Sequence, residues 1–142
     1  MYNEQVTISK SIVLQGSGYE YTQIVTDASP AVIMSSGEMM WFSIFSHTGI
    51  GVNLSGGDTL TKCVIWNCPS YGVSVTAGTS SIIQNCDIIL DNPSSGYYYP
   101  YSVSYDANGT FLSDILWNFS EFGAMGKNGN ATEMYCIVEN RI

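Results

Sequence analysis

A short phrase of alternating apolar residues recurs five times along this chain, and it constrains the fold more than any other feature. The fourth residue of each phrase serves as a mark, and the marks are Phe42, Cys63, Cys86, Asp114 and Cys136. They are separated by 21, 23, 28 and 22 residues. Repeats of roughly 20–50 residues are typical of stacked architectures, in which each unit buries its apolar face only against its neighbours. The sequence therefore predicts a solenoid.

Each repeat has the pattern of short β-strands joined by turns. Apolar residues alternate with other residues in 60–65 and again in 83–88, which is a strand signal. A second alternating segment follows in most repeats, as in 51–54 and 72–75. No stretch combines a 3.6-residue period with helix caps. We expect an all-β fold of about five to six coils, stacked at the usual strand separation of about 4.8 Å.

The phrase Ile83-Gln-Asn-Cys86-Asp-Ile88 resembles the I-x-N-C-x-I rhythm of right-handed parallel β-helices of the pectate-lyase-like superfamily. The segment 6–16 likewise resembles the early coils of that superfamily, and the likeness extends over residues 6–142. The resemblance implies a right-handed, single-stranded parallel β-helix of the phage tailspike or surface-protein type. This superfamily hosts lyases, hydrolases, tailspikes, adhesins and inert shafts, so the resemblance implies a fold more than a function.

The alternation also predicts which residues face the interior. The five marks form one inward column, beside a second column of Ile44, Ile65, Ile88, Leu116 and Val138. The resemblance implies, in addition, a turn ladder of Asn67, Asn118 and Asn140. Cys63 and Cys86 become vertical neighbours, and we expect buried free thiols rather than a disulfide. The reason is that parallel Cβ vectors about 4.8 Å apart exceed the usual 3.5–4.5 Å of a bridge.

Asp114 is the misfit of its column, because the other marks are apolar. Its carboxyl group either bonds turn amides or marks a local register shift, and a functional buried carboxylate is a third interpretation.

The residues between the inward positions face outward, and seven of them are apolar or aromatic. These interface candidates are Phe45, Val64, Trp66, Ile89, Ile115, Trp117 and Ile137. Monomeric proteins rarely expose an apolar area that is continuous across several coils. We expect it to be covered by a neighbouring subunit or shaft, by another stretch of the same chain, or by a sugar that stacks on it.

The longest interval between marks contains a tyrosine-rich insertion at residues 92–109. Tyrosine combines a rigid apolar face with a polar tip, which suits recognition loops and carbohydrate. The ligand-binding candidates are Tyr97, Tyr98, Tyr99, Tyr101, Tyr105 and Asp106. An equally plausible interpretation is a loop that folds over the apolar face.

Catalytic patterns are weak in this sequence. Glycoside hydrolases use paired carboxylates about 5–9.5 Å apart, and the only conceivable pairs are Asp87 with Asp91 and Asp114 with Glu121. The single histidine, His47, has no obvious Cys or Ser partner and is interpreted as a turn or edge residue. We therefore predict no catalytic residue, no metal site and no cofactor.

Charge restricts the partners. Four basic residues stand against twelve acidic ones, for a net charge of −8. Nucleic acid and anionic membranes both require clustered Lys or Arg, so the sequence predicts neither as a partner. No apolar run is long enough to span a bilayer.

The sequence as a whole predicts a single β-helix domain over residues 1–142, a segment of a larger protein or assembly, because no amphipathic helix caps either end. The predicted role is a non-enzymatic structural or binding module of a viral or phage fibre, tailspike or surface adhesin. Such a module acts in a homo-oligomer or larger assembly at the extracellular or virion surface, with carbohydrate as a candidate ligand. The alternative is a fragment of a polysaccharide lyase or glycoside hydrolase.

Overall fold

The computed structural model describes residues 4–76, 79–90, 99–103, 107–118, 125–127 and 130–140. These residues form eighteen short strands joined by turns. Every third strand belongs to the same sheet, so three parallel sheets of six strands each run along the molecule. Within the described ranges, no helix is long and apolar enough to cross a membrane.

Neighbouring strands of a sheet come from successive turns of the chain. The first sheet contains β1 (Val6–Ile8), β4 (Val32–Met34), β7 (Val52–Leu54), β10 (Tyr71–Val75), β13 (Tyr99–Val103) and β16 (Met125–Lys127). The second contains β2 (Val13–Gln15), β5 (Glu38–Met40), β8 (Thr59–Thr61), β11 (Ser80–Gln84), β14 (Asn108–Leu112) and β17 (Asn130–Met134). The third contains β3 (Gln23–Thr26), β6 (Ser43–Ser46), β9 (Val64–Trp66), β12 (Asp87–Leu90), β15 (Ile115–Asn118) and β18 (Ile137–Asn140).

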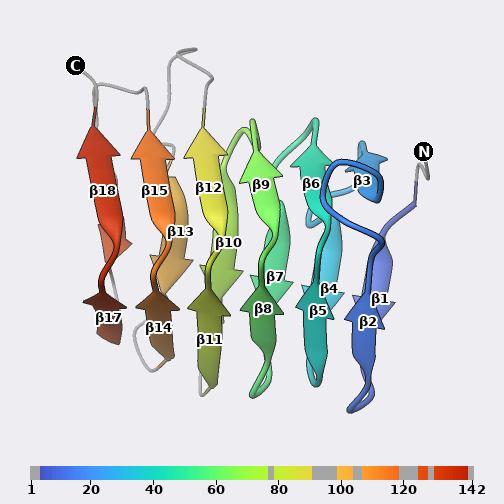
Figure 1. Cartoon of the computed structure of the whole chain (residues 1–142), viewed down its shortest axis with the longest axis horizontal. Coiled ribbons are helices and arrows are strands. Elements are labelled where there is room, and N and C mark those ends of the chain that lie inside the picture. The colour runs from blue at the N-terminus through green and yellow to red at the C-terminus, as the bar shows by residue number, and fades with distance from the viewer. Residues whose placement is uncertain are drawn as a thin grey trace.

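The chain winds as a right-handed coil. In Figure 1 it rises through the second and third sheets on the near side and descends through the first sheet on the far side. It advances from the N-terminus on the right toward the C-terminus on the left. This is the handedness expected of a crossover between parallel strands. The predicted all-β, parallel β-helical fold is confirmed.

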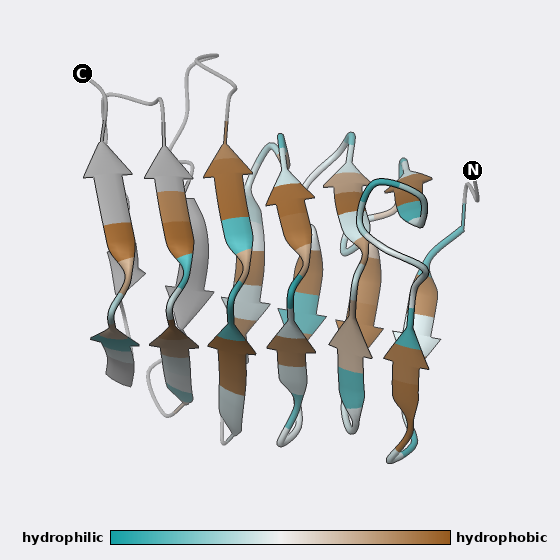
Figure 2. Ribbon diagram, viewed as in Figure 1, coloured by the Kyte–Doolittle hydropathy of each residue, from teal (hydrophilic) through white to brown (hydrophobic). Residues whose placement is uncertain are grey.

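The two predicted inward columns are also confirmed. The carbonyl of a mark accepts from the residue that follows the next mark, as in the Asp87 N–H to the Cys63 carbonyl at 3.0 Å and the Ile115 N–H to the Cys86 carbonyl at 2.9 Å. The side chains of the first four marks are buried. In the second column Ile44, Ile65, Ile88 and Leu116 are fully buried, and Val138 is the Cα partner of Leu116. Figure 2 shows apolar residues on the strands of all three sheets.

The asparagine ladder implied by the resemblance is interrupted. Asn118 and Asn140 are Cα partners, but the partner of Asn118 on its other side is Leu90. The Asn67 backbone N–H bonds the Ile89 carbonyl at 2.8 Å, so Asn67 lies next to Leu90, in the preceding turn of the solenoid. Two of the three asparagines are therefore adjacent.

A column of left-handed residues forms the bend between the second and third sheets. Trp41, Lys62, Asn85, Ser113 and Tyr135 have φ between 52° and 68°, and each directly precedes a mark residue. The N–H of Asn85 bonds the Leu112 carbonyl at 2.9 Å, so the inter-coil ladder continues through the bend. The left-handed conformation costs a residue other than glycine about 1–2 kcal/mol. Five such residues in one column indicate that stacking enforces the same bend in five successive turns.

Replacing an exposed member of this column by glycine should stabilise the fold. In Ser113→Gly the backbone strain is relieved, and part of the gain is offset by the greater freedom of glycine in the unfolded chain. We expect the free energy of unfolding to rise by about 0.5–1 kcal/mol in urea titrations. Thr110→Gly, in the strand that precedes this bend, is the matched control and should lower it, because that position is extended.

Candidate functional site

The seven interface candidates lie together on the outer face of the third sheet. We call this set the apolar stripe: Phe45, Val64, Trp66, Ile89, Ile115, Trp117 and Ile137. Ile89 is the Cα partner of both Trp66 and Trp117, and Ile115 is the partner of Ile137. Asp87 interrupts one column between Val64 and Ile115.

The described side chains of the apolar stripe are partly or fully exposed to solvent. Trp66 is 42% exposed and Ile137 60%, while Phe45, Val64, Ile89 and Ile115 are partly buried. The side chain of Trp117 lies outside the described part of the chain. The outward orientation predicted for this face is thus confirmed for the described side chains, and what covers it stays a prediction.

Two aromatic rings of the apolar stripe, those of Phe45 and Trp66, stack on one another along the solenoid axis. The Phe45 and Trp66 ring centroids lie 4.7 Å apart with an interplanar angle of 23°, which matches the usual distance between neighbouring strands. The Trp66 Nε1–H donates to Ser43 Oγ at 3.0 Å, which holds the indole against the sheet. Each of these two rings covers one face of the other. A sugar ring stacks on a free aromatic face, so this contact reduces the aromatic surface that a sugar could use.

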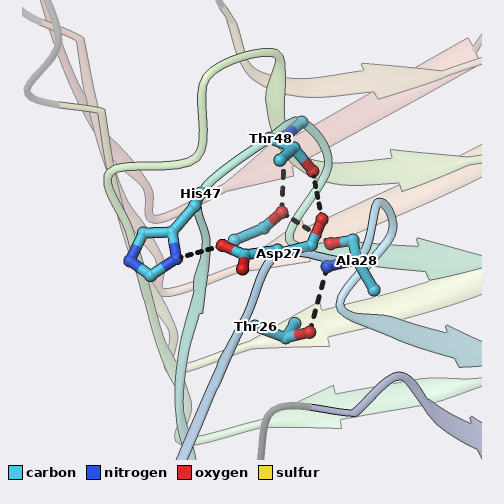
Figure 3. Close-up of polar contacts among 7 residues, drawn as sticks. Thr26, Asp27, Ala28, His47 and Thr48 are labelled. Atoms are coloured by element: carbon cyan, nitrogen blue, oxygen red, sulfur yellow. Dashed lines mark hydrogen bonds and ion pairs between the residues drawn. The ribbon is translucent and has the colours of Figure 1, made fainter.

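A polar cluster in the turns lies beside the apolar stripe (Figure 3). His47 Nδ1 lies 2.7 Å from Asp27 Oδ1, and the Thr48 hydroxyl donates to the Asp27 carbonyl at 2.6 Å. The Ser46 hydroxyl donates to the Ala28 carbonyl at 2.8 Å. These bonds connect the turns of two successive coils. Both nearby hydroxyls are engaged by backbone carbonyls rather than by the imidazole, which agrees with the interpretation of His47 as a turn residue.

A hollow of about 220 Å³ runs along the bend between the second and third sheets. Its lining consists of Tyr19, Trp41, Lys62, Cys63, Val64, Asn85 and Asp87. The Lys62 ammonium lies 4.7 Å from the centroid of the Trp41 ring, a cation–π distance. Burial raises the pKa of the Asp87 carboxyl. The hollow thus combines aromatic, amide and charged groups in one place.

Sequence reasoning singled out Cys63, Val64 and Asp87 for other reasons, but it missed the hollow and its other lining residues. The residues directly before each mark differ in chemistry, as Trp41, Lys62 and Asn85 illustrate. A pattern search based on apolar identity therefore passes over them. The signal that could have found them is their constant position, one residue before each mark.

The tyrosine-rich insertion is described only in part. Tyr99 and Tyr101 belong to β13, where Tyr101 is the Cα partner of Val73, a buried residue of the first sheet. Tyr97, Tyr98, Tyr105 and Asp106 lie outside the described residues, as do Asp91 and Glu121 of the conceivable carboxylate pairs. The ligand-binding set stays a prediction.

Asp114 bonds a backbone amide, as one of the three alternatives predicted. Its Oδ1 accepts from the Cys86 N–H at 2.7 Å, and its buried Oδ2 has no hydrogen-bond partner among the described residues. Burial raises the pKa of this carboxyl to about 7, and Asp87 adds to the effect. Cys63, Cys86 and the other two cysteines are free thiols, as expected.

The raised pKa of Asp114 predicts a pH-dependent stability. The folded chain holds this proton more tightly than the unfolded chain, so the stabilisation is present below about pH 4 and is lost as the pH rises toward 7. We expect the free energy of unfolding to fall by on the order of 3 kcal/mol over this window. Asp114→Asn, which retains an acceptor for the Cys86 N–H, should remove most of the fall in urea titrations at several pH values.

Burial also raises the pKa values of Asp58 and Asp87, so a smaller residual fall should remain in that variant. If the free energy of unfolding of Asp114→Asn fell with pH as steeply as that of the original chain, the pKa of Asp114 would not be raised in the folded state.

Within the described ranges, no three His, Cys, Asp or Glu side chains are grouped closely enough to hold a metal ion. No protein family, curated protein or solved structure matches this chain. The fold and its surfaces therefore carry the functional argument.

Proposed function

We propose that this chain is a non-enzymatic structural or binding module of the pectate-lyase-like β-helix type. It belongs to a viral or phage fibre, a tailspike or a surface adhesin at the extracellular or virion surface, and it acts in an oligomeric assembly. The observation that carries the proposal is the apolar stripe, which extends over successive coils of the third sheet.

The composition of the apolar stripe supports a protein partner. Interface cores are enriched in aromatic side chains and depleted of charge. The outer face of the third sheet carries the seven apolar or aromatic residues of the stripe, with Asp87 as a charged interruption between Val64 and Ile115. The Phe45 and Trp66 rings cover one face of each other, which leaves less aromatic surface for a sugar and favours packing against another apolar surface. A continuous stripe parallel to the axis also suits a shaft, in which elongated subunits contact each other lengthwise.

The net charge of −8 sets the condition for self-assembly. Two copies repel each other at long range, so apolar contact has to drive their association. Salt screens the repulsion and leaves apolar burial intact. Association should therefore strengthen as ionic strength increases.

Truncating the stripe should weaken self-association more than folding. Trp66→Ser removes a 42%-exposed aromatic side chain from the stripe. We expect about a tenfold rise in the dissociation constant, measured by sedimentation equilibrium. Ile82→Ser is the matched control, because Ile82 is 41% exposed on the second sheet, and it should leave the dissociation constant within about twofold.

A chain that remains monomeric at tens of micromolar, with Trp66 fluorescing as a solvent-exposed indole, would count against assembly through the stripe. Loss of the far-UV circular dichroism signal in Trp66→Ser would instead show that the indole supports the fold.

Carbohydrate contact is the second candidate, and the hollow at the bend favours it. Lys62, Asn85 and Asp87 provide hydrogen-bonding groups beside the aromatic rings of Tyr19 and Trp41. This arrangement fits binding better than hydrolysis, because a second carboxylate does not line the hollow among the described residues.

The non-enzymatic proposal predicts no turnover on a panel of neutral and acidic polysaccharides. Reducing-end release and absorbance of unsaturated products would be followed together, since these report hydrolases and lyases respectively. Turnover that is abolished in Asp87→Ala or Asp106→Ala would overturn the proposal in favour of a polysaccharide-degrading enzyme.

A further inference from the structure

Cys63 and Cys86 lie one directly over the other in the core of the solenoid. The strands on both sides of the pair are in register, because β8 pairs with β11 and β9 pairs with β12. The bend residues that precede the two cysteines, Lys62 and Asn85, share the same left-handed conformation, with φ of 52° and 54°. The two cysteine side chains therefore leave the backbone in the same direction, one strand spacing apart.

The two thiol groups are in contact. The side chains of Cys63 and Cys86 hydrogen-bond each other. The Cys86 sulfur also lies 3.6 Å from the carbonyl oxygen of Leu60, which belongs to the turn of Cys63. Both cysteines are buried, with exposed fractions of 1% and 0%, but Cys63 contributes to the lining of the hollow at the bend. The hollow therefore gives this core pair a route to solvent.

The spacing of the pair is too wide for a disulfide and suits a bridging metal ion. A disulfide needs Cβ atoms about 3.5–4.5 Å apart, whereas parallel side chains on neighbouring strands are about 4.8 Å apart. A metal ion bound in a line between two thiolates holds the sulfur atoms about 4.6 Å apart, because a metal–thiolate bond is about 2.3 Å long. The strand spacing of the solenoid therefore fits a sulfur–metal–sulfur bridge.

The number of ligands restricts the metal. Structural zinc takes four ligands, and calcium and magnesium take six or more, mainly oxygen atoms. Within the part of the chain that the structure describes, no third His, Cys, Asp or Glu joins the pair in a metal-binding group. Soft thiolate ligands select copper(I), a d¹⁰ ion that is stable with two ligands. The pair therefore matches copper(I) better than zinc or a hard cation.

We propose that Cys63 and Cys86 form a two-coordinate site for a copper(I) ion. Each thiol releases its proton to water and one sulfur–copper bond forms at each cysteine, while copper stays in the same oxidation state. The bound unit of two thiolates and one copper(I) ion has a charge of −1. The ammonium group of Lys62 supplies a positive charge in the lining of the hollow that Cys63 also lines.

This site goes beyond the proposed structural function and does not depend on it. The bound ion links two successive turns through their side chains, inside the core, whereas the apolar stripe lies on the outer face of the third sheet. Spacing along the chain gives no metal signal for the pair, because 23 residues separate its members and only the stacking of turns brings them together.

The first test is a competition for copper(I) in the absence of oxygen, with bicinchoninate as the coloured competing chelator. We expect the reduced chain to take up one copper(I) ion. Cys63→Ala and Cys86→Ala should each raise the dissociation constant by more than about a hundredfold, since loss of an outer-shell partner alone costs roughly 10–100-fold. Cys68→Ala is the matched control, because Cys68 is also 1% exposed, and it should leave the dissociation constant within about threefold.

A second measurement uses chains that retain the pair, so it does not depend on whether Cys63→Ala or Cys86→Ala folds. X-ray absorption at the copper edge should show two sulfur neighbours and no nitrogen or oxygen neighbour. The double variant Cys68→Ala/Cys136→Ala, in which Cys63 and Cys86 are the remaining cysteines, should give the same spectrum and the same stoichiometry. Trp66→Ser should also bind copper(I) as the original chain does, which separates this site from the proposed assembly.

Three results would overturn the inference. The first is a chain that takes up no copper(I) from the chelator. The second is loss of uptake in Cys68→Ala or in the double variant, which would place the ion on other thiols. The third is a copper ion with three or more neighbours, because the pair supplies only two.

Discussion

Parallel hydrogen bonding between successive turns is the interaction on which the rest of this structure depends. Each strand inside a sheet bonds its equivalents in the turns before and after it, in register, through all three sheets. The bonds continue through the bend at Asn85 and Ser113, outside the regular strands. Because the pitch is fixed by the strand spacing of about 4.8 Å, residues one repeat apart must lie directly over one another.

This stacking along the solenoid axis then determines which side chains of successive turns become neighbours. It places Phe45 over Trp66 as stacked rings, and it brings the thiols of Cys63 and Cys86 together in the core. It also gives Asp114 a buried place among apolar residues, where one oxygen bonds the Cys86 N–H and the other lacks a partner among the described residues. Because this single carboxyl group is buried in the core column, its titration makes the stability of the folded stack depend on pH.

The surface that solenoid packing leaves uncovered is the origin of the proposed role. The core columns are buried within the stack, but the outer face of the third sheet exposes apolar groups. This face runs along the solenoid axis and suits the proposed lengthwise contact between elongated modules. The acidic composition keeps such a module from associating without a matching apolar surface.

The sequence by itself determined the repeat, the parallel sheets, both inward columns and the outward apolar face, because strand alternation and constant spacing are local properties. Tertiary structure decided the left-handed bend at residues such as Lys62 and the hollow beside it. It also decided the register between turns, because the number of residues that each turn uses between strands is fixed only when neighbouring turns pair. The interrupted asparagine ladder is one result, since Leu90 takes the place between Asn67 and Asn118. The alternation of apolar residues predicts which side of a strand faces the core. Which residues of neighbouring turns lie opposite each other is fixed only when the strands have formed their hydrogen bonds.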